Sequence, residues 1–108
     1  MDIEHWRREI DEVDGELLRL LNIRARLAIK VGTLKRSDGL PLRDLDREHL
    51  VVDRLLEANA GPLDQKAVAR LFRRIMRESR RCEALAAQQP NGSNLTSASN
   101  STKLRGIA

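Results

Sequence analysis

A long apolar stripe in the first third of the chain constrains its fold more than any other feature. Its members are Trp6, Ile10, Val13, Leu17, Leu20, Leu21, Leu27, Ala28, Val31 and Leu34. Steps of three and four residues place side chains on one face of an α-helix. The pattern therefore predicts a single helix over about residues 3–36.

Two cations interrupt this apolar face. Arg24 lies four residues after Leu20 and four before Ala28, and Lys35 lies four residues beyond Val31. On a helix, their positions are roughly 16 Å apart along the axis and within about 20° of the same direction. A buried cation without a partner costs several kcal/mol, so both need an anion. That anion is either an acidic side chain of this chain or a small ligand gripped from both ends.

Two shorter helices are predicted after a loop at Ser37–Pro41. The second begins near Asp44, a good N-cap residue, and ends before Gly61-Pro62, and the third begins after Asp64. The inward face of the second is predicted to hold Leu45, Glu48, Val52, Leu55 and Leu56. The inward face of the third is predicted to hold Val68, Leu71, Phe72, Ile75, Met76, Ser79, Cys82, Glu83 and Leu85.

Residues 1–88 are thus expected to form one all-α domain of three helices per chain. Residues 89–108 are rich in Asn, Ser and Thr, which predicts a disordered tail or linker. A first helix of this length measures about 50 Å, well beyond the diameter of so small a domain. Part of its apolar face must then be covered by another chain, and a homodimer is the simplest arrangement.

Composition and charge pattern argue against several functional classes. The net charge is +4, but most of the basic residues are interleaved with acidic ones along the chain. One Trp, one Phe and no Tyr offer almost nothing for base stacking, so no nucleic-acid partner is expected. No His/Cys spacing resembles a metal site, and Cys82 alone allows no internal disulfide. Neither a membrane span nor a secretory signal is found, which favours a cytoplasmic protein.

Polar residues recur on the inner faces of the two shorter helices: Glu48 on the second, Ser79 and Glu83 on the third. One interpretation is an internal ion-pair network in which Arg24 and Lys35 neutralise Glu48 and Glu83. The other is a pocket walled by cations, acids and a hydroxyl. Such a pocket, without a nucleophile–base pair, a phosphate-binding Gly loop or a cofactor motif, suits binding a carboxylate-bearing molecule and catalysis by positioning and charge stabilisation.

Residues 3–88 resemble the all-helical chorismate mutase family. The matching features, in order, are Arg7, Ile10–Asp14, Leu17-Leu18, Leu20-Leu21, Arg24, Ala28–Lys35, Pro41–Glu48 and Leu71–Met76 followed by Ser79 and Glu83. Each piece is weak by itself, and their joint order and spacing are specific. The resemblance implies an intertwined helical homodimer that converts chorismate to prephenate, a Claisen rearrangement in phenylalanine and tyrosine biosynthesis, without a cofactor.

The resemblance also implies a role for each matching residue. Arg7 would reach in from the partner subunit and, with Arg24, bind the substrate carboxylates. Lys35 would bond a carboxylate and the ether oxygen, which Glu83 would also face.

At the other end of the substrate, Asp44, Arg47 and Glu48 would hold the ring hydroxyl, and Ser79 would assist one carboxylate. Many family members have Gln at the position of Glu83. An ionised Glu83 would repel the negative charge that develops on the ether oxygen, so we expect it to act in its protonated form. Burial would raise its pKa, and Arg24 and Lys35 would lower it.

Three alternatives remain at this stage. An isochorismate-pyruvate lyase would use a similar cationic pocket on the same scaffold. A non-catalytic domain that binds chorismate or prephenate could regulate a fused or associated aromatic-pathway enzyme. A purely structural helical dimer is disfavoured, because such a protein would gain stability by replacing Arg24 with Leu.

Overall fold

Three helices make up the part of the chain that the computed structural model describes, residues 2–89. Helix α1 spans Ile3–Ser37, α2 spans Leu45–Ala58 and α3 spans Gln65–Ala87. The predicted all-α, three-helix chain is confirmed. The predicted tail at residues 89–108 lies, apart from Gln89, outside the described residues, so it stays a prediction.

Each helix begins at an aspartate that accepts a hydrogen bond from the first turn. Asp2 accepts from the backbone N–H of His5, Asp44 from that of Arg47 and Asp64 from that of Ala67. These bonds satisfy backbone donors that have no partner within the helix. The starts predicted at Asp44 and Asp64 are therefore confirmed, each with its physical cause.

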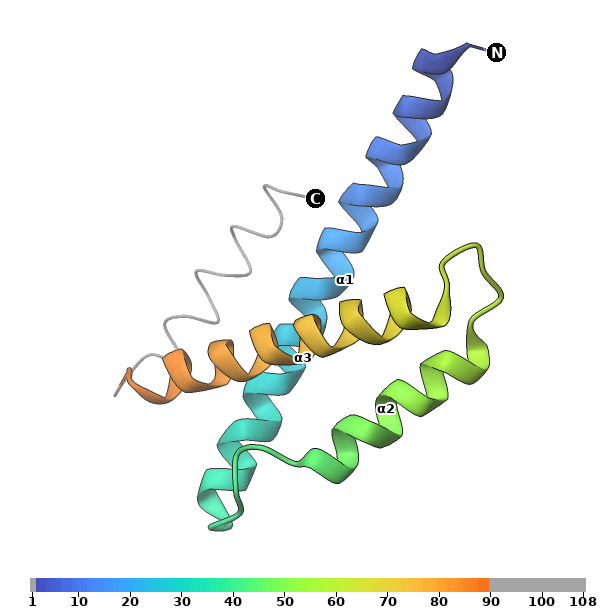
Figure 1. Ribbon diagram of the computed structural model, residues 1–108. Coiled ribbons are helices and arrows are strands. Elements are labelled where there is room, and N and C mark those ends of the chain that lie inside the picture. The colour runs from blue at the N-terminus through green and yellow to red at the C-terminus, as the bar shows by residue number, and fades with distance from the viewer. Residues whose placement is uncertain (1, 90–108) are drawn as a thin grey trace.

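Helix α3 crosses the C-terminal half of α1, and α2 lies along α3 (Figure 1). The N-terminal half of α1 extends away from both shorter helices (Figure 1). The apolar core is correspondingly small, and its buried residues are Val52, Val68, Ala69 and Met76. No helix among residues 2–89 is long and apolar enough to cross a membrane.

Three leucines assigned to inner faces by their spacing lie at the surface of the single chain. Leu45, Leu71 and Leu85 are about half exposed, at 52%, 49% and 50%. The assignment is wrong for the isolated chain because the neighbouring helices leave about half of each of these side chains uncovered. Helical spacing identifies an apolar face but not how much of it a neighbouring helix covers.

Candidate functional site

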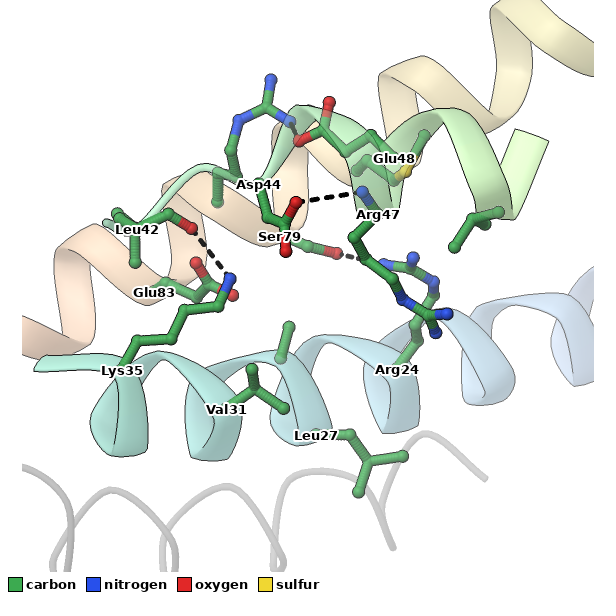
Figure 2. Close-up of a pocket in the computed structure, with 14 residues that line it drawn as sticks. Arg24, Leu27, Val31, Lys35, Leu42, Asp44, Arg47, Glu48, Ser79 and Glu83 are labelled. Carbon is green, nitrogen blue, oxygen red and sulfur yellow. Dashed lines mark hydrogen bonds and ion pairs between the residues drawn. The ribbon is translucent and has the colours of Figure 1, made fainter. Parts of the chain in front are cut away.

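An open pocket of approximately 290 Å³ lies where the three helices meet. Helix α1 forms its floor, α2 and the preceding loop form one wall, and α3 forms the other (Figure 2). The apolar part of the lining consists of Leu27, Ala28, Val31, Leu42, Val51 and Met76. The polar part consists of Arg24, Lys35, Asp44, Arg47, Glu48, Ser79, Arg80 and Glu83.

Arg24 is held at one end of the pocket by a hydroxyl from α3. Its Nη1 donates to the Oγ of Ser79 over 2.8 Å, and Ser79 itself is buried. Within residues 2–89, Arg24 makes no ion pair. A guanidinium has five N–H donors, so this bond orients the group and leaves donors for an anion in the pocket.

Lys35 stands at the opposite end of the same face of α1 (Figure 2). Its Nζ donates to the backbone oxygen of Leu42 over 3.0 Å, which ties the end of α1 to the loop before α2. An ammonium group has three donors, so two remain. Like Arg24, Lys35 has no ion pair in the described part of the chain. Two cations thus face one pocket from its two ends.

Glu48 is neutralised by different residues from those expected. Its Oε2 is paired with Nη1 of Arg80 on α3, and its Oε1 lies 3.6 Å from Nη2 of Arg43 in the loop. The ion-pair network of Arg24 and Lys35 with Glu48 and Glu83 is therefore wrong. Glu48 on α2 is paired with Arg80 and Arg43, so the two cations of α1, Arg24 and Lys35, remain open to a ligand.

Glu83 is buried against α1, with only 6% of its surface exposed. Its Oε2 is enclosed and has no hydrogen-bond partner among residues 2–89. Burial raises the pKa of the Glu83 carboxyl, although Lys35, Arg36, Arg80 and Arg24 act in the opposite direction. Desolvation wins this competition, and it favours the protonated, hydrogen-bond-donating form.

A glycine makes room for Glu83. Gly32 is the one buried residue of α1, and a Cβ at this position would lie 3.1 Å from Cγ of Glu83 and 3.3 Å from its Cδ. The absence of a side chain lets α3 approach α1 closely enough to seat the carboxyl. In the sequence, Gly32 stands out only as part of the Ala28–Lys35 segment, because residue spacing does not reveal a close contact between two helices.

Asp44 and Arg47 complete the wall beside α2. The Asp44 carboxylate accepts from the backbone N–H of Arg47 over 3.0 Å, while the Arg47 side chain extends over the pocket toward Arg24 (Figure 2). Seven of the eight expected site residues thus line one pocket: Arg24, Lys35, Asp44, Arg47, Glu48, Ser79 and Glu83.

Arg7 is the expected site residue that does not join the pocket of its own chain. It lies on the N-terminal half of α1, about 25 Å from Arg24 along the helix. Its side chain is 62% exposed and pairs with Glu4 at 2.9 Å. Within one chain, Arg7 therefore contributes nothing to the site.

Arg80 is the polar lining residue that sequence reasoning missed. It sits within a basic stretch of α3, and the sequence analysis does not assign it to the inner face of that helix. A usable signal existed, because Arg80 follows the buried Met76 by four residues and so lies near the same face. With Arg80 included, the lining holds four cations and three acids, and a protonated Glu83 leaves a surplus of two positive charges.

This arrangement can bind and orient a small dianion, and it offers a neutral donor and an ammonium group at one end. Within residues 2–89, no three His, Cys, Asp or Glu side chains gather as a metal site. The part of the chain that the structure describes places no cysteine or histidine in the pocket lining. The polar lining itself offers charge complementarity and hydrogen bonding to a ligand.

Comparison with known proteins agrees with this geometry. The family model described as chorismate mutase type II matches residues 6–84. The chain is 44% identical over 84 residues to the bifunctional chorismate mutase/prephenate dehydratase of Neisseria gonorrhoeae, covering 78% of this chain and 21% of that protein. It is 35% identical over 79 residues to the bifunctional protein of the same name from Aquifex aeolicus, covering 69% of this chain and 22% of that protein.

The chain spans about a fifth of the length of these bifunctional relatives. A solved structure of chorismate mutase (form II) from Thermus thermophilus is similar over nearly its whole length. It superposes with a TM-score of 0.75 at 36% identity, covering 76% of this chain and 93% of that one. Since the family model matches well over half of the sequence and the fold agrees, this chain belongs to the chorismate mutase type II family.

Proposed function

We propose that this chain is a chorismate mutase that rearranges chorismate to prephenate. The observation that carries the proposal is the pocket in which Arg24 and Lys35, both without ion pairs among residues 2–89, face each other across an open volume. A purely structural protein gains nothing from two such cations on an apolar helix face. A dicarboxylate substrate supplies the missing anions.

The reaction is unimolecular, so the enzyme must fold a flexible substrate into a compact, chair-like form. Arg24 and Arg7 of the partner subunit would bind the two carboxylates and supply this ordering. As the C–O bond breaks, negative charge grows on the ether oxygen. Lys35 and a protonated Glu83 would donate to it, and a preorganised donor of this kind is typically worth ~3–4 kcal/mol of barrier.

The remaining polar residues would hold the two ends of the substrate. Asp44, Arg47 and Glu48, along one wall, would bind the ring hydroxyl. Ser79 would assist a carboxylate through its bond to Arg24. This rearrangement requires no proton transfer.

We further propose an intertwined homodimer built on α1. Eight large apolar residues of its stripe are between 48% and 64% exposed: Trp6, Ile10, Val13, Leu17, Leu20, Leu27, Val31 and Leu34. So long an exposed apolar face marks an interaction surface. A second copy of α1 would bury it and would carry Arg7 of the partner subunit to the pocket.

The partners expected beyond the dimer also stay proposals. The bifunctional names of the relatives support a fused or associated aromatic-pathway enzyme for this chain. The cytoplasmic location remains a prediction.

One assay tests the proposed activity. Purified protein is mixed with chorismate, the loss of chorismate absorbance is followed, and the products are identified. Prephenate is the expected product, and Arg24→Ala is expected to abolish most of the activity. Salicylate and pyruvate would instead identify a lyase, and chorismate binding without turnover would identify a regulatory domain.

A further inference from the structure

One cation of the pocket has no role in the function proposed so far. Arg80 projects from α3, its side chain is 23% exposed, and it is paired with Glu48, whose side chain is 18% exposed. The pair connects the two walls of the pocket, because Arg80 lies on α3 and Glu48 on α2. Arg43 approaches the other oxygen of Glu48 at 3.6 Å, from a position that is 58% exposed.

Glu48 needs this pair if the pocket is to bind a dianion. A carboxylate in the lining repels the carboxylates of a substrate, and partial burial strengthens that repulsion. Arg80 cancels the charge of Glu48 from within the wall. The exposed Arg43 is screened by solvent, so it can do so only weakly.

The contact also fixes the direction of the Glu48 carboxylate. A glutamate side chain has three rotatable torsions, and a guanidinium bonded to one oxygen removes much of that freedom while the second oxygen can still accept. We propose that Arg80 is a positioning residue that holds Glu48 ready to accept the hydroxyl of a dicarboxylate substrate and keeps the pocket net positive. This inference rests on the proposed function, because it assigns a role within the same site.

The test compares Arg80→Ala and Arg80→Lys with a matched control, Arg81→Ala. Arg81 is the next residue of α3, is 73% exposed and lies 3.6 Å from Glu78, outside the pocket. For each variant of the whole chain, kcat and KM for chorismate are measured by absorbance, and thermal stability by circular dichroism. Arg80→Lys keeps the charge if Arg80→Ala fails to fold.

Arg80→Ala removes the closer of the two cations beside the part-buried Glu48 carboxylate and leaves only the exposed Arg43, so it should lower kcat/KM by roughly tenfold to a hundredfold, with KM rising. Arg80→Lys should recover part of this loss, and Arg81→Ala should match the wild type. Combining Arg80→Ala with Glu48→Gln should cost no more than the larger single effect, since one residue acts through the other.

Two results would overturn the inference while leaving the proposed function intact. One is an active wild type in which Arg80→Ala behaves like Arg81→Ala. The other is an Arg80→Ala, Glu48→Gln double variant whose losses multiply, because Arg80 would then act independently of Glu48. A wild-type chain that neither binds nor converts chorismate would overturn the proposed function and this inference together.

Discussion

At the scale of single residues, Glu83 brings together the two physical effects that decide the chemistry of the pocket. Its burial between α1 and α3 raises the pKa of its carboxyl, and four cations oppose that shift: Lys35, Arg36 and Arg24 on α1, and Arg80 on α3. The protonated form can donate to a developing oxyanion, whereas the ionised form repels it. The protonation state of this one group therefore controls the proposed reaction.

We expect the activity of the wild type to fall as pH rises through the pKa of Glu83. Glu83→Gln supplies a donor that does not titrate, so its kcat should be independent of pH over that range. The measurement is kcat against pH for both proteins. A wild-type profile that keeps its pH dependence in Glu83→Gln would exclude Glu83 as the titrating group.

The same substitution has a consequence for stability. The folded-state pKa of Glu83 is raised above its unfolded value, so the folded protein favours the protonated carboxyl. The contribution of this group to the free energy of unfolding is therefore present at low pH and is lost as pH rises through the folded pKa. Glu83→Gln removes this loss. We expect it to be more stable than the wild type at pH 8, with the difference shrinking toward pH 4, as measured by urea unfolding.

Arg24 and Ser79 should differ greatly in importance, although they share one hydrogen bond. Arg24→Ala removes a charged donor to a substrate carboxylate and should lower kcat/KM by a factor of about 10² or more. Ser79→Ala removes one charge-assisted hydrogen bond, worth roughly 1.5 kcal/mol, that orients the guanidinium, while Arg24 keeps its charge, so a loss of about tenfold is expected. Equal losses in steady-state assays of the two variants would contradict this division of roles.

At the scale of the helix, α1 contains two glycines, Gly15 and Gly32, whose surroundings differ. An added Cβ at Gly32 would press on Glu83 at 3.1 Å, while at Gly15 it would meet no atom of the described residues within 4 Å. Replacing glycine by alanine in a helix interior gains about 1 kcal/mol from propensity. Gly15→Ala should show that gain, and Gly32→Ala should not, because Glu83 must shift to make room.

Activity provides the second readout for this pair. Gly32→Ala should lower kcat by displacing the Glu83 carboxyl, while Gly15→Ala should leave kcat unchanged. Thermal unfolding and chorismate kinetics on both variants test the two expectations. A stabilised, fully active Gly32→Ala protein would contradict the close packing of α1 on α3.

Helix limits could be predicted from the sequence because the residues that set them are local. Apolar spacing predicted a first helix over about residues 3–36, and Asp44 and Asp64 marked the next two starts through bonds three residues away. Which charged side chains pair between two helices could not be predicted from such local signals. Glu48 pairs with Arg80 rather than with Arg24 or Lys35 because the rotation of α2 against α3 decides which cation it meets.

Most residues of the pocket could likewise be predicted from helical spacing, whereas contacts between distant parts could not. Polar residues on apolar faces identified Arg24, Lys35, Glu48, Ser79 and Glu83, all of which line it. The position of Arg7 has a different basis, since it came from family resemblance, and the single chain leaves it far from the pocket. The role proposed for Arg7 depends on a contact between two chains, which no pattern within one chain encodes.

At the scale of the whole molecule, the exposed stripe on α1 predicts the oligomeric state. Leu17 lies within the stripe and is 51% exposed in the single chain, so Leu17→Glu should place a charge in the dimer interface and dissociate it. Leu40, in the loop after α1 and 57% exposed, provides the control as Leu40→Glu. Sedimentation should give a dimer for the wild type and the control. A dimeric Leu17→Glu protein would contradict an interface through the stripe.

A shared active site can be tested by mixing two inactive proteins. If each pocket takes Arg24 from one chain and Arg7 from the other, Arg7→Ala and Arg24→Ala homodimers both lack a complete site. Subunit exchange creates a hybrid in which one pocket has both arginines and the other has neither. With equal amounts and random pairing, half of the dimers are hybrids, so about a quarter of all sites regain full function. Activity that rises on mixing toward about a quarter of the wild-type value would establish that Arg7 acts across the interface. Activity that stays at the level of the separate variants, with exchange verified by native mass spectrometry, would place Arg7 outside the site.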